Sequence, residues 1–241
     1  MATAKQAPAS AIPSTLPAAV DLLGETEFYG RTLPKRVRDE AARAIVARLG
    51  GETGYSGGFA LTAEERAEGF RVFTGEVMTS ASARHIATEE ATRALRVLQG
   101  APAHVQQAGE EGNRRLLAGL IARVDAVRDG AAHVCCGKCD VAVWRHLAAG
   151  GLNRPEDRPP FAMQWLHAFR DGKGGWQRHP FYYTVLTLTE VLMRTDVVTE
   201  AARSELEYAA PSLERRLRRQ AEAEPCARRR ADVMLRALAL L

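Results

Sequence analysis

The residues with the most distinctive chemistry lie in one short stretch, from His133 to Asp140. Three of the four cysteines, Cys135, Cys136 and Cys139, fall within five positions there. The surrounding pattern predicts a loop that runs into the first turn of a helix. Unpaired N–H groups and the helix dipole favour anions at such a start, and Lys138 adds a positive charge. We therefore predict thiols with lowered pKa values and a raised thiolate fraction.

One chemistry that this pattern favours is metal binding. Cys136 and Cys139 have the Cys-x-x-Cys spacing, which can place two thiolates at two corners of a zinc tetrahedron. His133 and Cys135 are near in sequence and are candidates for a third ligand, and His179 and Cys226 are candidates from elsewhere in the chain. No second Cys-x-x-Cys exists, so a closed zinc ribbon is not predicted. Zinc is the cofactor that the cysteines predict.

A second chemistry is thiol–disulfide exchange. Cys136 would attack a disulfide and Cys139 would resolve the mixed disulfide. Helical dithiol enzymes usually carry a histidine four positions after the second cysteine, where this chain has Val143. A third interpretation is purely structural: Cys135 and Cys139 are small buried residues that pack the start of a helix. The sequence leaves these three interpretations open.

The elements that must position these residues are predicted to be helices. Apolar residues recur at helical spacing and alternating β-branched runs are nearly absent, which predicts an all-α fold of packed helical hairpins. Caps, glycines and prolines set the expected bounds. We predict helices over 34–49, from the Thr62 capping box to about Phe73, over 80–100, 112–127, 139–149, 180–193, 199–209 and 212–222, and a last one to Leu241.

The chain is predicted to be one domain with a repeat inside it. Residues 1–17 are rich in Ala, Pro and Ser and predict a disordered tail, which leaves 18–241 as a single helical domain. Residues 126–130 (Ala-Val-Arg-Asp-Gly) recur as 168–172 (Ala-Phe-Arg-Asp-Gly). This recurrence predicts two repeat-like hairpins at about 112–150 and 155–194.

The second copy carries a family resemblance. Asp171 to Trp176 (Asp-Gly-Lys-Gly-Gly-Trp), followed by Pro180 to Thr184 (Pro-Phe-Tyr-Tyr-Thr), resembles the repeats of α/α-toroid proteins. That superfamily includes terpene cyclases, protein prenyltransferases and lanthionine-synthetase-like zinc proteins. The resemblance covers about residues 126–193 and implies a helix facing a cavity, with Cys136 and Cys139 at its mouth, where two branches hold zinc. The families' acid and complete zinc motifs are absent, so their catalytic residues do not transfer.

Aromatic residues near this loop predict a ligand pocket. Trp176, Tyr182 and Tyr183 would form its walls, and Asp140 and His179 would offer polar contacts to a small molecule. The simpler interpretation is that aromatic residues in helices belong to the core.

His85 and Glu89 form a weaker signal on the helix predicted at 80–100. They lie one turn apart and could share a metal ion. The Glu-x-x-His spacing of di-iron bundles is absent. We therefore expect this pair to lie on a solvated helix surface.

Charge and composition limit the classes of partner that the protein is expected to bind. The net charge is +4 and the isoelectric point about 9.0, but the two signs are interspersed. The one basic concentration, at residues 215–219 and 228–230, has glutamates interleaved with it, which predicts a solvated face and argues against a nucleic-acid partner. No apolar run approaches eighteen residues, so no membrane partner is expected. Clustered cysteines favour a reducing cytoplasm, and a homo-oligomer is compatible with the pattern.

The leading functional hypothesis is a small-molecule-binding protein, with enzymatic activity left open, whose zinc-type thiolate site lies near an aromatic pocket. One rival is a Cys-x-x-Cys thiol–disulfide redox protein. The other is a non-enzymatic helical-repeat interaction protein in which the cysteines are structural.

Overall fold

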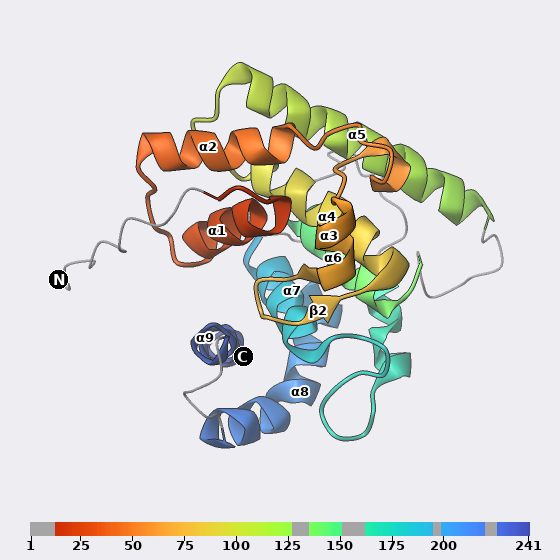
Figure 1. Ribbon diagram of the computed structural model, residues 1–241. Coiled ribbons are helices and arrows are strands. Elements are labelled where there is room, and N and C mark those ends of the chain that lie inside the picture. The colour runs from red at the N-terminus through yellow and green to blue at the C-terminus, as the bar shows by residue number, and fades with distance from the viewer. Residues whose placement is uncertain (1–12, 127–134, 151–161, 195–198, 220–225) are drawn as a thin grey trace.

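The computed structural model describes residues 13–126, 135–150, 162–194, 199–219 and 226–241, and it confirms the predicted all-α fold (Figure 1). Nine α-helices and one short two-stranded hairpin lie within these ranges. The helices are α1 (Leu16–Phe28), α2 (Lys35–Val46), α3 (Ala63–Glu68), α4 (Ser80–Arg96), α5 (Ala103–Ala126), α6 (Gly137–Ala148), α7 (Phe181–Arg194), α8 (Thr199–Arg219) and α9 (Ala227–Leu238). Two 3₁₀ segments, Tyr55–Gly57 and Ala162–Phe169, complete the helical elements.

Helices α4, α6 and α7 form the centre of the molecule. They pack on one another, with α1, α2 and α5 on one side and α8 and α9 on the other (Figure 1). Residues 85–95 of α4, 139–148 of α6 and 183–191 of α7 are buried without interruption. A helix buried on every side is a core helix, whatever the polarity of its individual residues. Both α4 and α6 carry residues of the site described below.

The N-terminal helix begins inside the predicted tail. Thr15 is the N-cap of α1, and its hydroxyl accepts a hydrogen bond from the N–H of Ala18 at 3.3 Å. The fully buried Leu16 donates its N–H to a carboxylate oxygen of Glu65 at 3.0 Å. Burial of this first turn therefore orders the chain two residues earlier than composition predicts. Residues 1–12 of the predicted tail lie outside the described residues.

The helix predicted from Thr62 to Phe73 is shorter than expected. The capping box is confirmed, since Thr62 and Glu65 exchange hydrogen bonds between side chain and backbone. The helix ends at Glu68, however, because Gly69 adopts a φ of 82° that turns the chain out of the helix. The next residues form β1 (Phe70–Arg71), which pairs antiparallel with β2 (Val77–Met78).

Helix α8 runs through a proline that was predicted to end it. The sequence predicted two helices separated at Pro211, whereas the structure has one helix from Thr199 to Arg219. A proline inside a helix costs about 3 kcal/mol. Ala209 and Leu213, on either side of it, are both fully buried, and burial of this kind offsets that cost.

A buried ion-pair network joins the three central helices. The Arg145 guanidinium of α6 donates to both carboxylate oxygens of Glu190 of α7, at 3.1 and 3.0 Å. It also pairs with Glu90 of α4, which accepts a hydrogen bond from the Tyr183 hydroxyl. Arg93 of α4 donates to Glu190 at 3.0 Å. A buried charge without its partner is strongly destabilising, so the network fixes the relative orientation of α4, α6 and α7.

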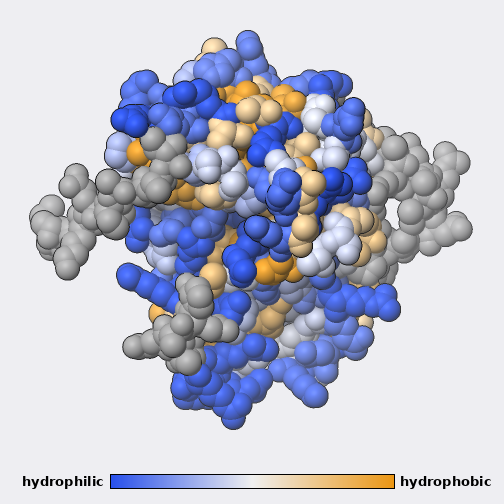
Figure 2. All heavy atoms as spheres, in the orientation of Figure 1, coloured by the Kyte–Doolittle hydropathy of each residue, from blue (hydrophilic) through white to orange (hydrophobic). Residues whose placement is uncertain are grey.

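The molecular surface agrees with the charge pattern of the sequence. Hydrophilic residues cover most of the face in Figure 2, and apolar residues appear there in small groups. Arg215, Arg218 and Arg219 of α8 are exposed, as predicted for a solvated face. Arg229 of α9 is not part of such a face, because it is 20% exposed and pairs with Asp21 and Glu25 of α1. In the described ranges, no helix has the length and apolarity needed to cross a membrane.

Candidate thiol and metal site

The cysteines lie at the beginning of α6, as predicted. Cys136 is the N-cap, with an extended backbone at φ −157° and ψ 162°, and its carbonyl accepts the N–H of Asp140 at 2.9 Å. The next residue is Gly137, at a position where the neighbouring loop leaves no space for a side chain. A Cβ at that position would lie 2.7 Å from the carbonyl oxygen of Arg178 and 2.9 Å from Nε2 of His179. The loop before α7 therefore presses directly on the first turn of α6.

Three metal-ligating side chains converge at this point. The donor atoms of His85, Cys135 and Cys139 all lie within 4.8 Å of one another. Nδ1 of His85 lies 3.4 Å from Sγ of Cys139. Zinc bond lengths of about 2.3 Å to sulfur and 2.0–2.1 Å to nitrogen give tetrahedral edges of about 3.5–3.8 Å. The separation between His85 and Cys139 is close to such an edge, so these residues could hold a metal ion.

Cys136 forms a second pair with Cys139. Their sulfurs lie 3.6 Å apart. The hydrogen bond from Cys139, together with the N–H groups of Cys139 and Lys138, lowers the pKa of Cys136 to about 5. The same hydrogen bond and burial raise the pKa of Cys139. The two sulfurs therefore form a pair of unequal acidity, in which Cys136 is the more acidic thiol.

The predicted lowering of thiol pKa values thus holds for Cys136 but is wrong for Cys139. The sequence shows a helix start and a nearby lysine, which favour thiolates. It does not show that Cys139 is only 1% exposed, and burial in a low-dielectric environment disfavours the charged form.

Glu89 is a buried carboxyl group beside the thiols. It lies one turn after His85 on α4, is 2% exposed, and its Oε2 has no hydrogen-bond partner among the described residues. Burial, reinforced by Glu90 and Asp140, raises its pKa well above the ordinary value. The expectation of a solvated surface for His85 and Glu89 is therefore wrong. Residues 85–95 of their helix are buried without interruption, and the polar residue types on this face of α4 gave no sign of that burial.

The remaining polar candidates have structural contacts. Asp140 is fully buried, and its Oδ1 accepts the N–H of Cys135 at 3.5 Å. His179 donates from Nδ1 to the carbonyl of Gln177 at 2.8 Å, and its ring stacks on Trp144. His179 thus lies against the thiol loop without belonging to the three converging donors. His133 lies outside the described residues.

The predicted wall residues are packed against partners of their own. Tyr183 is fully buried and donates to Glu90. The indole N–H of Trp176 donates to Glu205 at 2.7 Å. Tyr182 lies beneath the Arg216 and Arg230 guanidinium groups. The aromatic ring that packs against the site is instead that of Tyr55, whose centroid lies 3.8 Å from that of His85 with the two rings tilted by 38°. No pattern in the sequence predicts this contact.

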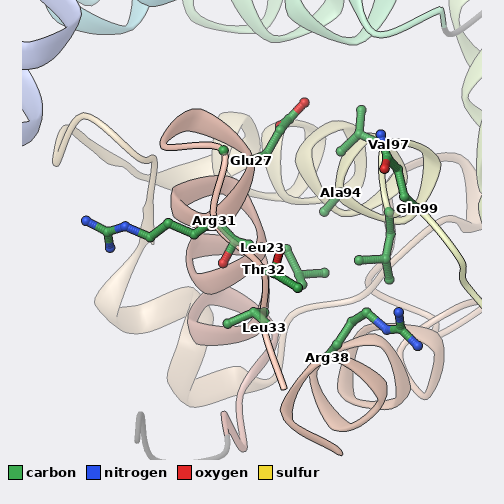
Figure 3. Close-up of a pocket in the computed structure, with 12 residues that line it drawn as sticks. Leu23, Glu27, Arg31, Thr32, Leu33, Arg38, Ala94, Val97 and Gln99 are labelled. Atoms are coloured by element: carbon green, nitrogen blue, oxygen red, sulfur yellow. The ribbon is translucent and has the colours of Figure 1, made fainter. Parts of the chain in front are cut away.

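A cavity of about 390 Å³ lies elsewhere, between α1, the start of α2 and the end of α4 (Figure 3). Leu23, Glu27 and Arg38 are among its lining residues. Arg31 points away from it in the close-up. Neither the thiols nor the predicted aromatic residues line this cavity.

Comparisons of the chain with protein-family models, curated proteins and solved structures gave no match. The α/α-toroid resemblance therefore stays a prediction.

Proposed function

We propose that the protein binds zinc through His85, Cys135 and Cys139. The observation that carries this proposal is the convergence of three donor atoms within 4.8 Å from two elements some fifty residues apart in sequence. Packing alone rarely brings two thiols and an imidazole to one point. The sequence predicts Cys136 and Cys139 as the two thiolate ligands, with His133 or Cys135 as a third. The proposed site keeps Cys139 and Cys135, leaves out Cys136 and adds His85.

The donor set favours zinc over harder cations. Thiolates and imidazole are the ligands of zinc, whereas magnesium and calcium take oxygen ligands. Two thiolates with a neutral imidazole balance the charge of a divalent ion. Cys139 must lose its proton to bind, so its raised pKa makes affinity increase with pH.

Three protein ligands leave one corner of a tetrahedron for a fourth group. Bound zinc with an open corner supplies a Lewis acid and lowers the pKa of a bound water. Oε2 of Glu89, buried and without a partner among the described residues, can accept a hydrogen bond from a molecule in that corner. This arrangement supports binding of a small polar molecule, and enzymatic action on it is part of the proposal.

The direct test is metal analysis of the purified full chain after zinc loading and dialysis. We expect one zinc per chain in the wild type and in Cys226→Ser, whose sulfur lies against the hairpin turn at Gly75. Cys139→Ser and His85→Ala are expected to lose the metal. A wild-type chain that retains no zinc, or a Cys139→Ser variant that retains it fully, would overturn the proposal.

The unequal pair Cys136 and Cys139 supports a second candidate, thiol–disulfide exchange. A half-buried thiolate with a pKa of about 5 lies 3.6 Å from a buried thiol, which is the arrangement of an attacking and a resolving cysteine. Cys136 would attack a substrate disulfide and release one thiolate, and Cys139 would then displace the second. The two cysteines lose two electrons and the substrate gains them.

This candidate predicts turnover of a disulfide substrate by metal-free protein. Cys139→Ser should trap the mixed disulfide on Cys136, and Cys136→Ser should be inactive, as followed by intact mass. Equal activity in the wild type and Cys136→Ser would exclude it.

A further inference from the structure

Cys139 belongs to two arrangements at once. Its sulfur lies 3.4 Å from Nδ1 of His85, within the three converging donors. The same sulfur lies 3.6 Å from Sγ of Cys136, which is not one of the three. Cys139 is therefore the one side chain shared by the proposed metal site and the neighbouring thiol pair.

These two uses of Cys139 exclude each other. A metal ion needs the Cys139 thiolate as a ligand. A disulfide to Cys136 needs the two sulfurs about 2.05 Å apart and leaves no thiolate on either. After such a bond forms, only His85 and Cys135 remain of the three donors, and Cys135 is exposed to solvent. Two ligands, one of them at the surface, hold zinc poorly compared with three.

We infer that the metal site is redox-controlled: oxidation of Cys136 and Cys139 to a disulfide releases the metal, and reduction restores the site. This inference rests on the proposed zinc site. Cys136 is half-buried and Cys139 is buried, so of these two sulfurs an oxidant reaches that of Cys136 first, while the exposed Cys135 is held as a metal ligand in the loaded protein. The adjacent pair Cys135 and Cys136 is a poorer disulfide partner, because neighbouring residues cannot readily meet disulfide geometry.

The oxidant that balances this step is a peroxide. The Cys136 sulfur attacks the terminal peroxide oxygen, the O–O bond breaks, and an alcohol or water leaves, with a sulfenic acid on Cys136. The Cys139 sulfur then attacks Sγ of Cys136, the S–O bond breaks and water leaves. Two thiolates give up two electrons to the peroxide, two protons are taken up, and the divalent ion departs as Cys139 ceases to be a ligand.

The experiment uses the zinc-loaded full chain and hydrogen peroxide, with released zinc followed by a chromogenic chelator. We expect the wild type to release its zinc as the intact mass falls by about 2 Da, the loss of two hydrogens in a disulfide. A thiol reductant followed by fresh zinc should restore binding. Cys136→Ser should release zinc at least about 10-fold more slowly, because the Cys136–Cys139 disulfide cannot form and the two sulfurs that remain at the site, those of Cys135 and Cys139, are both metal-bound. Cys226→Ser is the matched control and should behave as the wild type.

Peptide mapping of the oxidised wild type gives a second readout that does not depend on how a variant folds. A Cys136–Cys139 link supports the inference. A link through Cys135, or zinc release without any disulfide, overturns it, as does release from Cys136→Ser at the wild-type rate. In those cases the zinc site itself still stands, whereas a wild-type chain that takes up no zinc overturns both proposals.

Discussion

At the scale of single residues, His85 and Glu89 share one face of α4 but differ in what surrounds them. Nδ1 of His85 lies 3.4 Å from Sγ of Cys139. Glu89 is not among the mutually close donors, and its Oε2 has no hydrogen-bond partner among the described residues. The geometry thus assigns His85 to the proposed ligand set and Glu89 to its surroundings. Both positions can be varied separately.

We expect His85→Ala and Glu89→Gln to affect zinc affinity unequally. Removing a hydrogen-bond partner of a ligand typically costs about 10–100-fold in metal affinity, and Glu89→Gln should cost no more than that, because Oε2 of Glu89 bonds to no ligand among the described residues. His85→Ala removes a donor atom and should cost more. Competition with a chelator of known affinity measures both. A larger loss in Glu89→Gln than in His85→Ala would show that the carboxylate is itself a ligand.

At the scale of elements, the start of α6 depends on the loop before α7. Gly137 has room for a hydrogen atom but not for a methyl group, because atoms of Arg178 and His179 lie less than 3 Å from the position that a Cβ would occupy. His179 is held by its bond to the Gln177 carbonyl and by the Trp144 ring. The loop therefore sets the position of the first turn of α6, and with it the positions of Cys136 and Cys139.

We predict that Gly137→Ala destabilises the protein by about 1–3 kcal/mol, the cost of overpacking a tight interior position. It should also weaken zinc binding, since the α6 start must shift. Urea unfolding and chelator competition measure the two effects. Gly172→Ala is a control for the volume added, because no atom lies within 4 Å of its Cβ position, although its φ of 76° adds backbone strain of its own. Unchanged stability in Gly137→Ala would contradict this account of the crowding.

At the scale of the whole molecule, the buried network holds α4, α6 and α7 together, and so joins His85 to the cysteines. Burial alone would raise the pKa of Glu190, but Arg145 and Arg93 outweigh it and lower that pKa to about 2. A carboxyl group with a lowered folded pKa stabilises the protein above its unfolded pKa, and this contribution is lost as the pH falls through the folded value.

We predict that Glu190→Gln destabilises the protein by about 3–5 kcal/mol at neutral pH, because it leaves buried arginine charges uncompensated. The difference from the wild type should shrink as the pH falls from the ordinary value of 4.5 towards 2. Urea unfolding at several pH values measures it. Glu214→Gln removes an exposed pair, 3.9 Å from Arg218, and should change stability by less than about 1 kcal/mol. Equal effects of the two substitutions would contradict a structural role for the network.

Helices were the most predictable part of the fold, because capping, glycine and hydrophobic spacing act over a few neighbouring residues. The capping box at Thr62 and the helix start beside Pro180 are confirmed, and the helix predicted from Cys139 begins two residues earlier, at Gly137. Two failures came where distant contacts outweighed a local signal. Pro211 stays inside a helix, and α1 begins at Leu16, in both places beside residues that are fully buried.

The sequence by itself determined that thiols gather at a helix start, since Cys136 and Cys139 are three residues apart along one chain. Only the tertiary structure decided that His85 faces them from a helix fifty residues away, and that Glu89 is buried next to them. The physical reason is that ligand geometry and dielectric environment depend on which helices pack together. That packing is set by the burial of whole helix faces and by the ion pairs of the core, which no local spacing encodes.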